Sequence, residues 1–142
     1  MELLKNEISD YGITSFYYYS AILYISAGYY NESIRMLNKI LVLNERPIQP
    51  EKAMFAKYLL LLAHYELGNM EVLNSINEKM FGPNEFIEPL NLLKQQLPLI
   101  QNRKEEKSFF TDFKKQLLRS KNKELLQKYF DFLSWAENKI KR

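Results

Sequence analysis

The side chains that could carry chemistry are few in this 142-residue chain. His64 is the only histidine and there is no cysteine. No second imidazole and no thiol can therefore complete a metal site or a nucleophile and base pair. His64 also occupies a position that the repeat pattern described below assigns to the apolar core. The sequence predicts a packed histidine there, with no catalytic residue and no metal ligand.

The carboxylates offer no better candidate for a catalytic site. They occur close together at Glu66 and Glu71, at Glu85 and Glu88, and at Glu105 and Glu106. Only Glu85 and Glu88 share a helical face, and neither belongs to a glycosidase or metal motif. The patterns GxGxxG, GxxxxGK[ST] and GxSxG are absent, and four scattered glycines cannot build a phosphate cradle. We therefore expect no enzyme activity and no cofactor.

Positive charge is concentrated in the last third of the chain. Residues 1–100 hold 8 Lys/Arg against 11 Asp/Glu, whereas residues 101–142 hold 12 against 6. The basic residues Lys114, Lys115, Arg119, Lys121 and Lys123 follow or interleave with Phe109, Phe110 and Phe113. Phosphate contacts combined with stacking aromatics would suit single-stranded nucleic acid. However, the phenylalanines have helical core spacing and should be buried, so the lysines are equally explained as the solvated face of a helix.

The composition predicts one folded domain over residues 1–142. An apolar fraction of 46% with 14% aromatics is far from the composition of disordered chains. Acidic residues interrupt the opening MELLKNEISD, which excludes a secretory signal, and no apolar run approaches the roughly 18 residues of a membrane span. We expect a cytoplasmic protein, and the absence of cysteine fits a reducing compartment.

The clearest pattern is an internal repeat of two helical hairpins within residues 15–81. Residues 17–41 and 57–81 align without gaps when Gly28 is placed on Gly68, and most core positions remain apolar. In each copy an apolar helix reaches the glycine, and an amphipathic helix begins one or two residues later. A period of 40 residues is typical of repeat arrays. The first helix of each copy is apolar nearly all round, which predicts a helix packed between neighbours.

About seven helices are expected in all. Residues 1–10 look like the tail of a helix that ends at a break over Asp10, Gly12 and Thr14, and seven helices follow at 15–27, 31–43, 51–67, 70–80, 85–97, 108–118 and 123–140. Residues 84–142 would form a C-terminal helical cap. Because the first helix has no preceding partner, we expect the chain to be a fragment of a longer repeat protein.

The first hairpin resembles a tetratricopeptide repeat. The residues that carry the resemblance are Tyr24, Gly28, Tyr30 and Ser33, with Gly68 repeating the turn glycine in a weaker second copy. The ending YFDFLSWAENKI resembles the C-terminal part of uncharacterised bacterial tetratricopeptide proteins. The resemblance implies an all-α, right-handed array of helical hairpins.

The resemblance also implies a concave groove lined by the first helix of each repeat. The groove residues would be Tyr18, Ile22, Ile25, Phe55, Tyr58, Leu62 and Tyr65. An apolar, aromatic groove suits an apolar or amphipathic helix of a protein partner, or the adjacent repeats of the parent chain. The alternative is that the C-terminal helices cover this surface and make it core. The expected function is a non-catalytic protein-interaction or scaffold module, and the alternative is a regulatory domain that senses a peptide or binds nucleic acid through the basic end.

Overall fold

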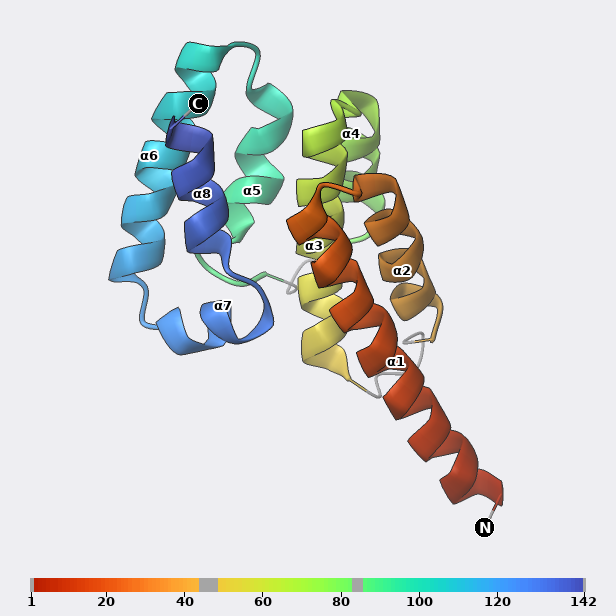
Figure 1. The fold of residues 1–142 in the computed structure, drawn as a ribbon. Helices are drawn as coiled ribbons and strands as arrows, with labels where there is room; N and C mark the ends of the chain where they lie inside the picture. The colour runs from red at the N-terminus through yellow and green to blue at the C-terminus, as the bar shows by residue number, and fades with distance from the viewer. Residues whose placement is uncertain (1, 44–48, 83–85, 142) are drawn as a thin grey trace. The chain divides into compact units, whose positions relative to one another are not determined.

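The computed structural model describes residues 2–43, 49–82 and 86–141, with residues 2–11 described for their backbone alone. This part of the chain contains eight α-helices, one short 3-10 helix and no strand (Figure 1). The predicted all-α class is confirmed. The contacts group the chain into two compact units, Met1–Asn69 and Met70–Arg142. The boundary follows Gly68, so the two helices that the sequence pairs in the second hairpin fall in different units.

The N-terminal unit consists of three helices, α1 (Glu2–Ala27), α2 (Tyr30–Leu43) and α3 (Pro50–Leu67). α1 and α2 form an antiparallel hairpin, and α3 contacts both of them (Figure 1). The buried residues of α1 are Thr14, Tyr18, Ala21 and Ile25, and those of α2 are Ser33, Leu37 and Ile40. Both sets are three or four residues apart, as one face of a helix requires. The hairpin is thus held by one apolar stripe from each helix.

The two predicted turn glycines both end a helix in the left-handed conformation. Gly28 has φ 82° and Gly68 has φ 76°. The amide of each glycine donates to the carbonyl three residues earlier at 3.0 Å, and the next amide donates to the carbonyl five residues earlier at 2.8 or 2.9 Å. α2 and α4 then begin two residues after their glycine, at Tyr30 and Met70. The two turns are therefore locally equivalent, as the repeat predicts.

The predicted break near the N-terminus is wrong. α1 is continuous from Glu2 to Ala27 and passes through Asp10, Gly12 and Thr14. A glycine inside a helix costs only about 0.5–1 kcal/mol relative to alanine, which the remaining turns of a 26-residue helix can offset. The N-terminal end of α1 extends beyond α2 (Figure 1). One long helix therefore replaces the two short ones that the sequence predicted.

The two helices that look apolar on all sides differ in burial. α3 is buried all round over Phe55–Ala63, apart from the half-buried Lys57, so the prediction of a helix packed between neighbours is confirmed there. α1 instead exposes Phe16 by 65%, Tyr19 by 62% and Leu23 by 70%. For α1 the prediction is wrong, because the face opposite its buried stripe remains uncovered.

The C-terminal unit contains the remaining elements. They are α4 (Met70–Lys79), α5 (Asn91–Gln96), the 3-10 helix η1 (Leu97–Leu99), α6 (Arg103–Arg119), α7 (Lys123–Tyr129) and α8 (Phe132–Lys141). α6 packs against α8, and α4 contacts α5 and η1. Asn77 of α4 donates from Nδ2 to the carbonyl of Lys94 at 2.6 Å, which ties α4 to α5.

Two predicted helices in this unit begin at a different residue in the structure. The helix predicted over 85–97 begins only at Asn91, after Pro89, because proline restricts the residue before it and lacks an amide donor. The sequence predicts a connector at 44–51 and a helix start at 83–84; residues 44–48 and 83–85 lie outside the described residues. α6 begins at Arg103 instead of Ser108, because Asn102 Oδ1 accepts from the Glu105 amide at 2.9 Å and caps the helix.

The last predicted helix, 123–140, is in fact two helices. Phe130 is extended, with φ −165° and ψ 147°, and interrupts the helical backbone. Asp131 then caps α8, because its Oδ1 accepts from the Ser134 amide at 3.0 Å and its Oδ2 accepts from Ser134 Oγ at 2.7 Å.

An aromatic cluster joins α6 to α8. Trp135 is 8% exposed, and its ring meets Phe110 edge-on at 4.9 Å and Phe113 at 6.4 Å. Phe109 stacks on Phe113 at 5.7 Å. The predicted burial of Trp135 and of the three phenylalanines is confirmed.

Replacing a glycine by alanine should lower the stability at Gly28 and Gly68 and raise it at Gly12. Gly28→Ala and Gly68→Ala should each lower the free energy of unfolding by about 1–2 kcal/mol, because a Cβ disfavours positive φ. Gly12→Ala should raise it by about 0.5–1 kcal/mol, since Gly12 lies inside α1 and no atom lies within 4 Å of the added Cβ. Urea unfolding followed by circular dichroism measures all three. A loss of stability in Gly12→Ala would contradict a continuous α1.

Trp135→Ala should destabilise the C-terminal unit by about 3–5 kcal/mol, because it removes a buried ring from the cluster. Leu118→Ala on α6 is the control, since this side chain is 46% exposed and should change stability by at most about 0.5 kcal/mol. Both are measured by urea unfolding. Equal midpoints for the two variants would place Trp135 outside the core.

Candidate functional site

The seven predicted groove residues lie on α1 and α3 of the N-terminal unit, and most of them are buried. Tyr18 is 1% exposed and Ile25 is 6% exposed on α1, and Phe55, Tyr58 and Leu62 are fully buried on α3. Ile22 and Tyr65 are half-buried. Side chains with so little exposure offer little contact area to a partner in this conformation.

The repeat-defining residues serve the turns and the helix packing. Ser33 is fully buried and its Oγ donates to the Tyr30 carbonyl at 2.8 Å. A small residue at this position lets α2 lie close to its neighbours. Tyr24 is half-buried, and its ring meets Tyr29 edge-on at 6.5 Å. These residues therefore contribute to the scaffold of the hairpin.

The uncovered face of α1 is the apolar surface that the sequence analysis did not single out. Its residues are Gly12, Phe16, Tyr19, Leu23 and Ser26, all exposed; we call it the α1 stripe. They are alternately four and three residues apart, which is the spacing of a seam between two packed helices. No charged residue belongs to the stripe. The heptad-like spacing would have identified it in the sequence, but the all-round apolar character of the helix masked it.

Lys52 of α3 borders the α1 stripe. Its Nζ donates to Ser15 Oγ at 2.8 Å and lies 5.4 Å from the centre of the Tyr19 ring. This pair of contacts joins α3 to α1 and restrains Tyr19 without burying it. The aromatic side chain is thus held in place while 62% of it stays exposed.

His64 lies near the end of α3 and is half-buried. Its Nδ1 lies 3.1 Å from Asn69 Nδ2, which donates to it when the ring is the neutral Nε2–H tautomer. Burial lowers the pKa of His64 below its usual value of 6.5, because desolvation disfavours the charged imidazolium. The predicted role as a packed histidine fits this environment. Among the described residues, no group of three His, Cys, Asp or Glu side chains could hold a metal ion.

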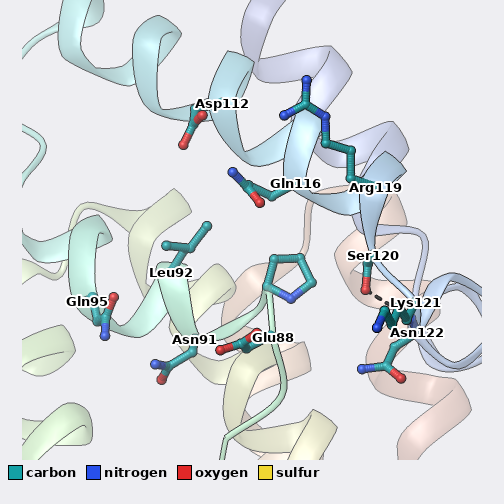
Figure 2. Close-up of a pocket in the computed structure, with 11 residues that line it drawn as sticks. Glu88, Asn91, Leu92, Gln95, Asp112, Gln116, Arg119, Ser120, Lys121 and Asn122 are labelled. Atoms are coloured by element: carbon teal, nitrogen blue, oxygen red, sulfur yellow. Dashed lines mark hydrogen bonds between the residues drawn. The ribbon is translucent and has the colours of Figure 1, made fainter.

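A polar hollow lies between α5 and α6 in the C-terminal unit. Its volume is 670 Å³. Figure 2 shows Asp112, Gln116 and Arg119 projecting from one helix, with Asn91, Leu92 and Gln95 on the other wall. The turn after α6 adds Lys121 and Asn122, and Glu88 lies before α5. Glu88 was singled out in the sequence only as a partner of Glu85, which lies outside the described residues.

The basic residues of the last third do not combine with exposed aromatics. Lys104, Lys107 and Lys115 lie on one face of α6 around a second, shallower hollow. Lys114 instead pairs with Glu137 of α8, with 3.6 Å between Nζ and Oε1. Because the three α6 phenylalanines are in the core, this face offers phosphate contacts but no ring from that cluster on which a base could stack.

Comparison with protein-family models, with curated proteins and with solved structures finds no match to this chain. In the part of the chain that the structure describes, no helix has both the length and the apolar character needed to cross a membrane. The function must therefore be inferred from the geometry of the chain's own residues.

The free energy of unfolding should fall as the pH drops below 6.5. Below that value the unfolded chain binds a proton at His64 that the folded chain resists, because the folded-state pKa is lowered. His64→Gln should remove this slope between pH about 5.5 and 7, where carboxylates titrate little. Urea unfolding at several pH values measures it. An identical pH profile for the variant would show that His64 is not desolvated.

Proposed function

We propose that this chain is a non-catalytic protein-interaction module with a tetratricopeptide-like architecture. The observation that carries the proposal is the α1 stripe, where Phe16, Tyr19 and Leu23 each expose 62–70% of their surface on one helical face. Neighbouring large apolar side chains on one face are the mark of a binding surface, whereas single exposed ones are common.

The partner proposed for the α1 stripe is an amphipathic helix. A straight row of side chains with alternate spacings of four and three accepts the ridge of a second helix. Phe16 and Tyr19 would act as the anchors, since aromatic side chains supply most of the contact energy in many interfaces. The small residues at the two ends, Gly12 and Ser26, allow close approach of the partner backbone. Binding should depend weakly on salt, because the stripe holds no charge.

The tetratricopeptide-like architecture is supported by the local equivalence of the two turns. Gly28 and Gly68 have the same left-handed conformation and the same two hydrogen bonds, 40 residues apart. The α1 and α2 hairpin adds a buried small residue, Ser33, where the family has one. The proposal moves the binding surface from the predicted groove to the opposite face of α1.

An anionic partner is the second candidate, and the basic face of α6 is the observation that favours it. Lys104, Lys107 and Lys115 span about three turns on one side of the helix, and Asp112 is the one acidic residue among those that line the hollow beside them. Contacts of this kind bind nucleic acid without sequence preference and weaken steeply with salt. Binding of single-stranded nucleic acid that persists at physiological salt and is lost in a triple Lys→Gln variant would favour this candidate.

Binding of a partner to the α1 stripe should weaken when the apolar side chains of the stripe are replaced. The double variant Phe16→Ser, Leu23→Ser should weaken binding by about 100-fold, because each buried apolar side chain contributes about 1.5–3 kcal/mol. The matched control is Val42→Ser, Leu99→Ser, which replaces side chains of equal exposure elsewhere, at 68% and 69%. Proteins retained by the immobilised chain are compared among the three forms, and the specific ones are then titrated at two ionic strengths.

The proposal requires a protein that the wild type and the control retain and the stripe variant loses. Sedimentation of the chain alone at several concentrations identifies a second copy as the partner, if association disappears in the stripe variant. Retention of the same proteins by all three forms would place the interaction elsewhere and contradict the proposal.

A further inference from the structure

We propose that the hollow between α5 and α6 binds the free ends and the backbone of a short zwitterionic peptide of about three residues. The site lies wholly in the C-terminal unit and shares no residue with the α1 stripe. It is therefore independent of the protein-interaction function proposed above.

One wall of the hollow carries an acidic and a basic residue on the same face of α6. Asp112, Gln116 and Arg119 are four and three residues apart on α6, so they lie on one face, as Figure 2 shows. Asp112 and Arg119 are seven residues apart, and a rise of 1.5 Å per residue separates their Cα atoms by roughly 10 Å along the axis. Lys121 lies in the turn that follows and adds a second cation to the Arg119 end.

The four charged residues of the hollow have no ion-pair partner within the described part of the chain. Neither Asp112 nor Arg119 forms an ion pair with any residue that the structure describes, and the same holds for Lys121 and for Glu88 on the other wall. The four charges sum to zero. Along α6, a ligand with only carboxylates or only amines would meet a charge of its own sign at one end, whereas a zwitterion would meet opposite charges at Asp112 and Arg119.

The groups between the charges suit a peptide backbone. Gln116 of α6 and Asn91 and Gln95 of α5 belong to the lining, as does Asn122 in the turn after α6 (Figure 2). A side-chain amide has both a donor and an acceptor, as a peptide unit does, so each can pair with a backbone N–H and C=O. Leu92 adds one apolar contact for a ligand side chain.

The length and volume of the hollow set the size of the ligand. An extended peptide spans about 3.3–3.6 Å per residue, so three residues match the roughly 10 Å between Asp112 and Arg119. The volume of 670 Å³ lies in the range of small-ligand sites. We assign the ligand carboxylate to Arg119 and Lys121, and the ligand ammonium to Asp112.

The test uses trialanine with free ends, its N-acetylated form and its C-terminal amide. Nuclear magnetic resonance titration should show saturable shifts of the side-chain amide signals of Asn91, Gln95 and Gln116. Blocking either end should weaken binding about three- to fivefold, because an exposed ion pair contributes at most about 1 kcal/mol. Dialanine should bind more weakly than trialanine, since it cannot reach both ends.

Two variants separate the two ends of the ligand. The double variant Arg119→Gln, Lys121→Gln should abolish the difference between the free carboxylate and the amide but keep the difference between free amine and acetyl, and Asp112→Asn should do the reverse. Lys107→Gln is the control, because it removes a cation from α6 outside this hollow and should preserve both differences. The α1 stripe variant Phe16→Ser, Leu23→Ser should also bind trialanine normally.

Two outcomes would overturn the proposal. One is the absence of saturable shifts with trialanine at millimolar concentration. The other is equal binding of all three trialanine forms, or equal weakening of all three by both variants, which would show that the charged ends are not recognised. If the chain does not bind the peptide but the α1 stripe still binds its partner, the peptide proposal fails and the proposed function stands.

Discussion

The left-handed conformation of Gly28 and Gly68 is the constraint on which the hairpin geometry depends. A residue with positive φ lets each helix end and the chain turn within two residues, and the hydrogen bonds of these two turns satisfy carbonyls that a helix end would otherwise leave unpaired. Once Gly28 ends α1, the buried stripes of α1 and α2 must face each other. The fully buried Ser33 then lies where a larger side chain would hold the two helices apart.

The exposed surface of the N-terminal unit follows from the same geometry. The hairpin uses the face of α1 that carries Tyr18 and Ile25, and α3 is the only other helix of the unit that contacts α1. Phe16, Tyr19 and Leu23 project from the opposite face, so their exposure is a consequence of how the helices pair. A helix whose sequence is apolar all round can thus be central, as α3 is, or covered on one side only, as α1 is. Composition cannot distinguish the two, because the difference lies in what packs on the second face.

The sequence predicted the features that local residue patterns determine, and it missed helix boundaries and the hollow, which depend on other interactions. Helical periodicity and the two glycines predicted the all-α class, the α1 and α2 hairpin and the burial of Trp135. The apolar pattern does not give the starts of α6 and α8, because the N-cap residues Asn102 and Asp131 determine them. Gly12 does not end α1, because the cooperativity of a long helix offsets the local cost of the glycine. The polar hollow could not be predicted, since its lining comes from two helices and a turn that no sequence motif places side by side.

The aromatic core of the C-terminal unit fixes the position of that hollow. Phe110 and Phe113 can meet Trp135 only if their face of α6 turns toward α8. With 3.6 residues per turn, this rotation places Asp112, Gln116 and Arg119 on a neighbouring face and Lys104, Lys107 and Lys115 on the outer one. The buried rings fix the rotation of α6 about its axis. The charged residues are therefore aligned on one face without contacts of their own to the core. A rigid core that positions exposed polar groups in this way lets the surface change its chemistry without a change in fold.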